Sequence, residues 1–398
     1  MVGGLVGVNV WKRKQPTSAS PKSLVTTIKG DARTTRAFAW YSDSPQADAI
    51  VQVAKGAGNG SFEGSNVLVV KGTSRAIRTG GGREQGAHQV EVTGLSPGTT
   101  YTYRVGSGEG GAWSEPASFT TEEADASRFT FINVTDSQGE TEGDFALWGA
   151  TLDRAFATYP DARFIVHNGD LTENPQDEKA WDAFFRQARR YLTSIPLMPV
   201  TGNHDEEGGK ADRFVSHFNV PDNGAEGSIP GTTYSFDYGT AHVVVLNTES
   251  NLKAQTKWLR DDLARTGKPW KIIALHRGPY GGNRNEKVEE WTSVFDEFAV
   301  DLVLQGHNHE YSRSYPLRGG SIAGDGVRPV RGREGTVYVV ANTAGPKFNK
   351  KKEDLFYHKV HVQNGKQVFA AITIDGGTLT YRAYEADGNK LDEFVIVH

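Results

Sequence analysis

Five short polar segments, each directly after an apolar run, carry the side chains of this chain that could do chemistry. They supply carboxylates, a side-chain amide and imidazoles, the oxygen and nitrogen ligands that suit two adjacent divalent or trivalent metal ions. The chain has no cysteine, which excludes thiolate ligands, thiol catalysis and disulfides. The segments are Asp136-Ser137-Gln138-Gly139, Gly169-Asp170, Gly202-Asn203-His204-Asp205, His276 and Gly306-His307-Asn308-His309.

The apolar runs before these segments are expected to be buried strands, and they must position the polar side chains. Ligands of an open α/β sheet gather beyond the carboxyl ends of its strands. Asp136 precedes Asp170 by 34 residues, a gap that fits one helical crossover to a parallel neighbour. Apolar stripes at helical spacing predict helices over 141–158 and 177–192. The sequence therefore predicts one crevice where the five segments meet. The expected strands are 129–135, 163–166, 195–200, 271–275 and 301–304.

Residues 22–121 are expected to form an all-β domain, because apolar and polar residues alternate and Gly and Pro clusters separate the runs. The segment Leu95 to Val105 resembles the fibronectin type III signature, with Tyr101 as the candidate tyrosine corner and Trp40 as the core indole. Residues 122–127 are a polar linker. From there to residue 398 strands alternate with helices, the pattern of an α/β domain, and residues 357–398 return to alternating strands. Residues 1–21 are expected to be an extended or poorly ordered N-terminal segment.

The order Asp, Gly-Asp, Gly-Asn-His-Asp, His, Gly-His-x-His resembles the calcineurin-like metallophosphoesterase superfamily. The stretch from Gly306 to Pro316 is similar to its purple acid phosphatase branch, and the likeness covers nearly the whole chain after residue 20. It implies an α/β/β/α domain of four layers, with two sheets packed face to face. It also implies a phosphoric ester hydrolase with two metal ions per chain (Fe, Zn or Mn), in which a hydroxide between the metals attacks phosphorus in line without a covalent phosphoenzyme.

The resemblance also assigns roles to the residues of the five segments. His204 is expected to face the substrate and to protonate the leaving oxygen, and we expect Asp205 to orient its imidazole. The implied metal ligands are Asp136 and His309 on the first metal, Asp170 as the bridge, and Asn203, His276 and His307 on the second metal.

Two positions depart from the family pattern at the first metal. Purple acid phosphatases have a tyrosine three residues after the bridging aspartate, where this chain has Glu173. Most other metallophosphoesterases have a histidine two residues after the first aspartate, where this chain has Gln138. Gln138 binding through its amide oxygen, Glu173 replacing the tyrosine, and an open site filled by water are the three alternatives. We favour Gln138, and predict an uncoloured protein with weaker or more promiscuous binding of the first metal.

Substrate contacts are expected from the segment after His276. Arg277, Tyr280 and Arg284 are the candidates, because an arginine fork matches a phosphate dianion. The leading hypothesis is a phosphatase acting on small phosphate monoesters. The alternatives are a phosphodiesterase acting on nucleotides or glycerophosphodiesters and, from another class, a catalytically silent binding protein. Among the other histidines, His167 could make a hydrogen bond behind the metal site. The remaining ones are interpreted as surface or incidental, namely His88, His217, His242, His358, His361 and His398.

Composition limits the partners and says little about the compartment. With 44 Lys and Arg against 48 Asp and Glu, the formal net charge is −4, so no basic platform for nucleic acid is expected. No apolar run approaches the length of a membrane span. Residues 1–11 are apolar and precede Lys12-Arg13-Lys14, the reverse of a secretory signal. We interpret them as an altered start of the chain, and a secreted or cell-envelope location follows from the resemblance alone. Oligomeric state is open.

Overall fold

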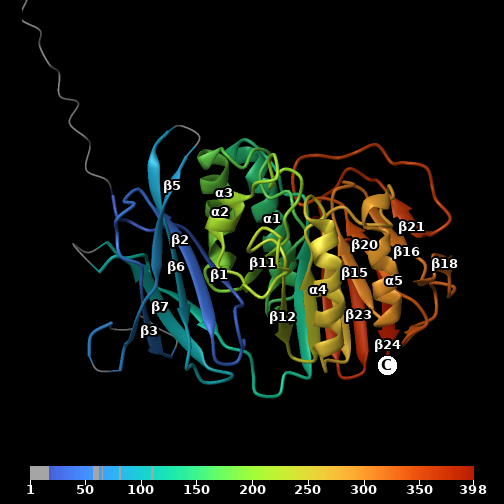
Figure 1. Cartoon of the computed structure of the whole chain (residues 1–398), viewed down its shortest axis with the longest axis horizontal. Helices are drawn as coiled ribbons and strands as arrows, with labels where there is room; N and C mark the ends of the chain where they lie inside the picture. Colours follow the sequence, from blue (N-terminus) through green and yellow to red (C-terminus); the bar gives the residue numbers. More distant parts are fainter. Residues whose placement is uncertain (1–17, 57–61, 65, 80–81, 109–111) are drawn as a thin grey trace, which may run out of the picture.

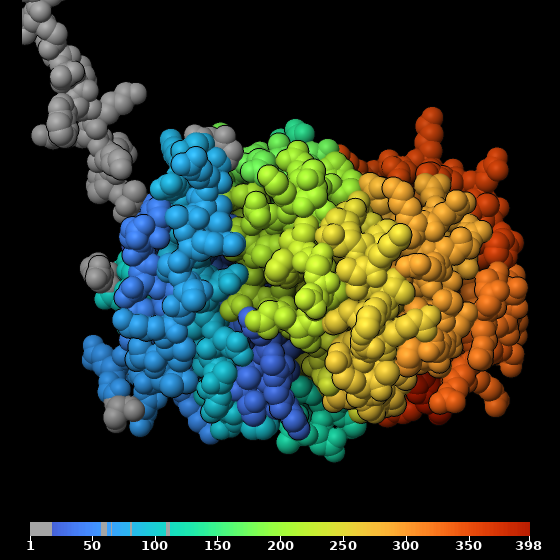
Figure 2. Space-filling view, viewed as in Figure 1, coloured from blue at the N-terminus to red at the C-terminus, as the bar shows by residue number. Residues whose placement is uncertain are grey.

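The computed structural model describes residues 18–398 except 57–61, 65, 80–81 and 109–111. Residues 1–17 of the expected N-terminal segment 1–21 therefore lie outside the described residues. A β-sandwich at the left of Figure 1 is followed by a larger α/β domain at the right. The space-filling view shows the two packed against each other as one body (Figure 2). No helix in the described part of the chain is both long enough and apolar enough to cross a membrane.

The sandwich consists of two antiparallel sheets, with strand orders β1-β2-β6-β5 and β4-β3-β7-β8. Trp40 is 1% exposed and lies in the core between the sheets, as expected. The Tyr101 hydroxyl accepts a hydrogen bond from the Ser96 backbone N–H at 2.8 Å, the kind of contact that a tyrosine corner makes. The strands are β1 (Lys22–Thr27), β2 (Arg36–Ser42), β3 (Ile50–Lys55), β4 (Leu68–Lys71), β5 (Thr73–Arg78), β6 (Glu84–Val92), β7 (Thr100–Gly106) and β8 (Ala117–Thr120).

The first sheet of the α/β domain has the order β11-β10-β9-β22-β23-β24-β19. Its β9, β10 and β11 run parallel and are joined by the two helices that periodicity predicts, α1 (Glu142–Thr158) and α2 (Glu178–Leu192). Thr141 and Asp144 form a capping box that starts α1, and the Asp177 side chain caps α2. The strands are β9 (Arg128–Val134), β10 (Ile165–His167), β11 (Leu197–Pro199), β19 (Val330–Arg331), β22 (Val368–Asp375), β23 (Thr378–Glu385) and β24 (Lys390–Val397).

The second sheet has the order β12-β13-β14-β15-β20-β16-β21, and β13, β14, β15 and β20 run parallel. In Figure 1 the helices α4 and α5 lie in front of it. Its strands are β12 (Tyr234–Tyr238), β13 (Ala241–Val245), β14 (Trp270–Ala274), β15 (Leu302–Gln305), β16 (Tyr311–Ser314), β20 (Val337–Ala341) and β21 (His358–Val362). The other elements are α3 (Asp212–His217), α4 (Leu252–Arg265), the 3-10 helix η1 (Glu286–Val288), α5 (Glu290–Glu297) and the hairpin β17 (Leu317–Arg318) with β18 (Ser321–Ile322).

Side-chain alternation along β14 explains the layering of the α/β domain. Ile272 packs into the large core shared with Ile132 of the first sheet. Its neighbour Ile273 points to the opposite face, into a second core with Leu259 of α4 and Phe295 of α5. Because successive strand residues face opposite sides, the two sheets pack face to face with helices outside. This is the α/β/β/α arrangement that was expected.

Three histidines interpreted as surface or incidental are buried instead. His88 is fully buried, His217 is 1% exposed and His242 is 6% exposed. The His217 ring stacks on Tyr41 of the sandwich at a centroid distance of 4.1 Å and lies 4.3 Å from the Trp181 ring. Their burial depends on contacts between segments far apart in the sequence, such as the docking of α3 on the sandwich, which a local pattern does not encode.

Candidate metal centre

The candidate ligands lie on sharply turned backbone directly after the strands. Asp136, Asp170, His307 and His309 have φ values of 53°, 55°, 73° and 46°. These values lie in the left-handed region, which costs a non-glycine residue about 1–2 kcal/mol. Strain of this kind persists only where the surrounding structure holds it, and it concentrates at functional sites. The strand ends therefore turn abruptly at four of the predicted ligand positions.

Two glycines of the motifs allow these turns to approach one another. A Cβ atom on Gly202 would lie 2.2 Å from Asp170 Oδ1, and one on Gly306 would lie 2.2 Å from Thr135 Oγ1 and 2.9 Å from Asp136 Oδ2. Real Cβ atoms do not come so close to other atoms. The glycines in Gly-Asn-His-Asp and Gly-His-x-His are thus required by packing around the two aspartates.

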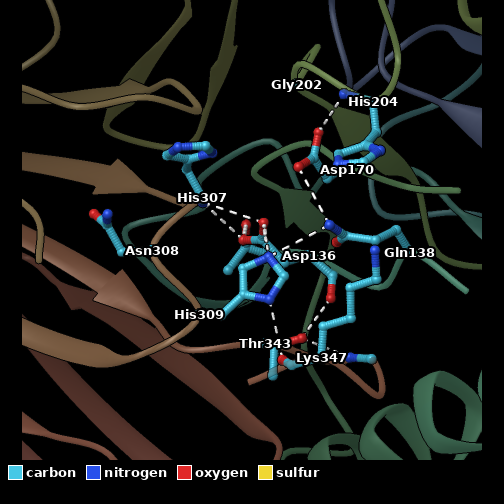
Figure 3. A network of polar contacts seen from close by, with 12 residues as sticks. Asp136, Gln138, Asp170, Gly202, His204, His307, Asn308, His309, Thr343 and Lys347 are labelled. Atoms are coloured by element: carbon cyan, nitrogen blue, oxygen red, sulfur yellow. Dashed lines mark hydrogen bonds and ion pairs between the residues drawn. The ribbon is translucent and has the colours of Figure 1, made fainter. Parts of the chain in front are cut away.

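The side chains after the strands gather into two metal-type clusters that share one carboxylate. Asp170, His276 and His307 offer ligand atoms within 4.8 Å of one another, and so do Asp136, Asp170 and His309. His276 Nε2 lies 3.1 Å from Asp170 Oδ2, and His309 Nε2 lies 3.0 Å from Asp136 Oδ1. Figure 3 shows Asp136, Asp170 and His309 converging on a common space. Asp170 is therefore placed to bridge two ions.

Hydrogen bonds behind the imidazoles leave one nitrogen of each directed at the clusters. His276 Nδ1 lies 2.7 Å from the Asn168 carbonyl oxygen, and His309 Nδ1 lies 3.1 Å from the Lys347 carbonyl oxygen. A carbonyl can only accept, so each Nδ1 carries the proton and each Nε2 is free to bind a cation. Asn203 joins the second cluster, with its Oδ1 atom 3.2 Å from His276 Nε2.

Gln138 lies at the first cluster, where the sequence left the ligand open. Its Nε2 atom is 3.4 Å from Asp170 Oδ2 and 3.4 Å from His309 Nε2. Its Oε1 atom is buried without a hydrogen-bond partner. A half-turn of the amide, whose two ends have nearly the same shape, would direct that oxygen at the cluster. Glu173 instead forms an ion pair with Lys347, which makes Gln138 the better fit to a metal.

The charges of the two clusters favour a cation. Burial alone would raise the pKa of Asp136 and of Asp170, but the neighbouring His309 and His276, respectively, hold each pKa below its usual value. Burial opposes protonation of His276, yet the charge and hydrogen bond of Asp170 raise its pKa to about 10. Burial and the charge of His276 lower the pKa of His307 to about 4. Protons on imidazole thus offset two buried carboxylates, and metal ions would displace those protons.

The expected pairing of Asp205 with His204 is wrong. The Asp205 carboxylate is buried and accepts backbone N–H bonds from Asp170 at 2.7 Å, Gly202 at 2.9 Å and Leu171 at 3.1 Å. It therefore fixes the backbone that carries the bridging aspartate. His204 is oriented by the Glu173 main chain instead, with Nδ1 2.9 Å from that carbonyl oxygen. Its Nε2 atom is left available to a substrate, and its side chain is 30% exposed.

Of the three predicted substrate contacts, Arg277 lies at the centre. Its Nε atom donates to Asn203 Oδ1 at 3.2 Å and lies 3.5 Å from Glu249. Tyr280 is 3% exposed and packs against other tyrosine rings in the second core. Arg284 pairs with Glu289 and lies over the Tyr280 ring. The assignment of Tyr280 to the substrate is wrong, because its side chain is buried in the second core. The assignment of Arg284, whose side chain is 35% exposed, stays a prediction.

Asn168 is a structural residue of the centre that the sequence did not reveal. Its buried side chain donates to the Leu275 carbonyl at 3.0 Å and to the Leu304 carbonyl at 2.8 Å. Asn168 thus ties the end of β10 to the ends of β14 and β15. The available signal was a polar residue at the end of an apolar run. The hydrogen bond expected of His167 is confirmed: its Nε2 atom lies 2.9 Å from Ser137 Oγ.

Comparison with known proteins agrees with this geometry. Residues 21–121 match the family model described as the purple acid phosphatase N-terminal domain, and residues 129–311 match the calcineurin-like phosphoesterase model. The chain thus carries a purple acid phosphatase N-terminal domain followed by a calcineurin-like phosphoesterase domain. More narrowly, it has the two-domain organisation of a purple acid phosphatase-like enzyme, and it is a metallophosphoesterase.

Individual relatives extend over most of the chain. The acid phosphatase type 7 of Mus musculus is 27% identical over 374 residues, covering 82% of this chain and 81% of the mouse protein. A protein of Arabidopsis thaliana named probable inactive purple acid phosphatase 27 is 26% identical, covering 67% of this chain and 51% of that protein. The structure of a purple acid phosphatase from yellow lupin (Lupinus luteus) seeds superposes with a TM-score of 0.82 at 18% identity, covering 95% of this chain and 74% of the lupin chain. The last comparison shows a common fold.

Proposed function

We propose that this chain is a phosphomonoesterase that acts on small phosphate esters with two bound metal ions. The observation that carries the proposal is the pair of clusters that share Asp170. Next to them lies the His204 imidazole, whose Nε2 atom is available to a substrate. Asp136, Gln138, Asp170 and His309 would hold the first ion, and Asp170, Asn203, His276 and His307 would hold the second. Bound there, two cations acidify a water molecule and neutralise the non-bridging oxygens of a phosphate ester. Fe, Zn and Mn all suit these oxygen and nitrogen ligands.

The residues around the clusters would bind and orient the ester. Arg277 lies beside Asn203 with a side chain that is 36% exposed, so its guanidinium can reach a phosphate oxygen while Glu249 limits its movement. In its doubly protonated imidazolium form, with Nδ1–H held by the Glu173 carbonyl, His204 would donate the Nε2 proton to the leaving oxygen and become neutral. Asp205 acts only through the backbone of Asp170. Protonation of the leaving group by a positioned side chain contributes about 10²–10⁴-fold in rate.

The replacement His204→Gln tests this role, with His398→Gln as the control. His398 pairs with Asp301 near the C-terminus, away from the two clusters. For an alkyl phosphate, whose leaving group needs a proton, His204→Gln should lower kcat by roughly 10²-fold or more. For p-nitrophenyl phosphate, whose leaving group is stable as an anion, the loss should be much smaller, and metal content should not change. Equal losses on both substrates would refute the role of His204 as the acid.

A phosphodiesterase is the second candidate, because the same two-metal arrangement can clamp a diester. The turnover of p-nitrophenyl phosphate and of its bis ester by the metal-loaded protein separates the two, and higher kcat/KM on the diester would reverse our order. A catalytically silent protein is the third candidate, and the name of the Arabidopsis relative shows why it must be tested. Hydrolysis of neither ester by metal-loaded protein would favour it. A secreted or cell-envelope location is also proposed on family resemblance.

A further inference from the structure

The carboxylate of Glu173 and the ammonium of Lys347 form an ion pair between two loops that meet at the metal centre. Glu173 follows the bridging Asp170 closely in the chain, and Lys347 lies in the loop between β20 and β21. Each of the two residues also orients a histidine with its main-chain carbonyl. The Glu173 carbonyl oxygen lies 2.9 Å from His204 Nδ1, and the Lys347 carbonyl oxygen lies 3.1 Å from His309 Nδ1 (Figure 3). The ion pair therefore joins the residue behind the proton donor to the residue behind a first-metal ligand.

The loop that carries Lys347 is held firmly against the first cluster. Before Lys347, the Gly345 N–H donates to the Asp136 carbonyl at 3.1 Å, and a Cβ atom on Gly345 would lie 2.9 Å from that same oxygen. After Lys347, the Asn349 side chain donates to the Asn308 carbonyl at 2.6 Å. Contacts on both sides of Lys347 thus fix its main chain, and its ammonium extends from a fixed point.

The main chain of Glu173 has weaker support. The Glu173 N–H reaches the Gly139 carbonyl oxygen only at 3.4 Å, which is long for a hydrogen bond. The contact of the carboxylate with the Lys347 ammonium is shorter and is charge-assisted, which makes such a bond roughly twice as strong as a neutral one. The ion pair therefore ties a weakly held residue to a firmly held loop. The weakly held residue is the one that orients His204.

We propose that Glu173 and Lys347 are a positioning pair for His204. The proposal rests on the proposed function, because it takes His204 to be the group that protonates the leaving oxygen. A fixed Glu173 carbonyl fixes the direction of the Nδ1–H bond, and with it the direction of Nε2 on the other side of the ring. The position that holds a tyrosine ligand in purple acid phosphatases would then serve the proton donor of this chain and not its first metal.

Two other roles for the pair give different results when the residues are replaced. An ammonium has three donors and the Lys347 side chain is 43% exposed, so Lys347 could bind a substrate oxygen directly. Its replacement would then raise KM. Glu173 could leave the pair and bind the first metal ion, and its replacement would then lower metal content. Loss of a positioning pair lowers kcat instead, and does so where the leaving group needs a proton.

Turnover of an alkyl phosphate and of p-nitrophenyl phosphate by metal-loaded Lys347→Met and Glu173→Gln tests the proposal. Each is measured at the pH of its own maximal kcat. Lys390→Met is the control, because Lys390 pairs with Glu393 on β24 and its side chain is 52% exposed. A partly exposed ion pair adds little to stability, so all variants should fold.

Each of the two site variants should lower kcat on the alkyl phosphate by about 10-fold, since a misplacement of about 1 Å can cost about 100-fold. Both should lose much less on p-nitrophenyl phosphate, and KM and metal content should stay near those of the wild type. The double variant Glu173→Gln/Lys347→Met should lose no more than either single variant, because both changes remove the same contact. Lys347→Arg keeps the charge and should recover most of kcat.

Three kinetic or analytical results would overturn the proposal. They are losses that multiply in the double variant, a raised KM with unchanged kcat in Lys347→Met, and the loss of a metal ion in Glu173→Gln.

Nuclear magnetic resonance of protein with isotope-labelled histidine gives a readout that needs no turnover. In the Zn²⁺-loaded wild type the His204 Nδ1 proton should give a slowly exchanging signal, assigned by its loss in His204→Gln. The signal should broaden in Lys347→Met and persist in Lys347→Arg and Lys390→Met. If the wild type hydrolyses no ester, the proposed function fails, while this signal still decides whether the ion pair orients the ring. Absence of the signal in the wild type, or an equally sharp signal in Lys347→Met, overturns the positioning pair.

Discussion

Replacement of Asn168 by alanine should destabilise the protein and loosen its metal centre, although the side chain touches neither cluster directly. The change removes two donors, to the Leu275 and Leu304 carbonyls. The Leu304 carbonyl keeps a bond from the Leu275 N–H, so one net hydrogen bond of about 1 kcal/mol is lost there. The Leu275 carbonyl has no other hydrogen bond within the described part of the chain. Leaving it unsatisfied costs about 1–3 kcal/mol, for a total of about 2–4 kcal/mol.

Chemical unfolding followed by tryptophan fluorescence, together with metal titration, measures both effects. Asn219→Ala is the matched control, because its buried amide donates to the Val90 carbonyl at the interface with the sandwich at 3.1 Å. Both variants should lose stability. Only Asn168→Ala should weaken metal binding, by about 10–100-fold, as changes behind metal ligands typically do. Unchanged stability of Asn168→Ala, or metal binding equal to that of the control, would refute the claim that this amide holds the strand ends together.

Three further predictions concern other parts of the structure. Asp205→Asn should lower stability and metal retention together, whereas a residue that only orients an imidazole would change the pH profile of kcat and leave metal content alone. Burial opposes protonation of His242, but Asp237 and Asp262 raise its pKa from 6.5 to about 9. Protonated His242 therefore contributes up to about 3 kcal/mol to the free energy of unfolding. That contribution is complete below pH 6.5 and is lost as pH rises through 9; unfolding of His242→Gln should lack this dependence. Iron-loaded protein should show no intense visible band, and such a band in the wild type would contradict a first-metal site that lacks a tyrosinate ligand.

Local pattern was enough to predict which polar segments meet at the ends of the strands and where the two helices lie, because both depend on short-range spacing. A residue that must follow a buried strand, such as Asp170, is visible in the sequence together with the strand. The hydrogen-bond partner of a polar side chain is not visible in the sequence. Asp205 follows His204 directly, yet its carboxylate turns inward to three backbone N–H groups. Whether a side chain faces the crevice or the backbone depends on the turn, which the motif alone does not specify.

Contacts between distant segments account for the remaining differences. Tyr280 was assigned to the substrate because it lies four residues after His276, but its loop is held against the second sheet by Gln305, which accepts the Tyr280 N–H at 3.4 Å and donates to the Tyr280 carbonyl at 2.9 Å. His361 of β21 lies beside Glu310, which comes from a turn 51 residues earlier in the chain. Pairings over such separations arise from the register of the sheet, and a single sequence does not encode them visibly.

Anomalous diffraction from crystals of metal-loaded protein tests the central claim most directly. We predict two peaks that share Asp170, one also bounded by Asp136 and His309 and the other by His276 and His307. In Asp170→Asn protein both peaks should weaken, because the bridging carboxylate serves both ions. A single ion remote from Asp170, or ions at these ligands that are unaffected by Asp170→Asn, would contradict a dinuclear centre bridged by this residue.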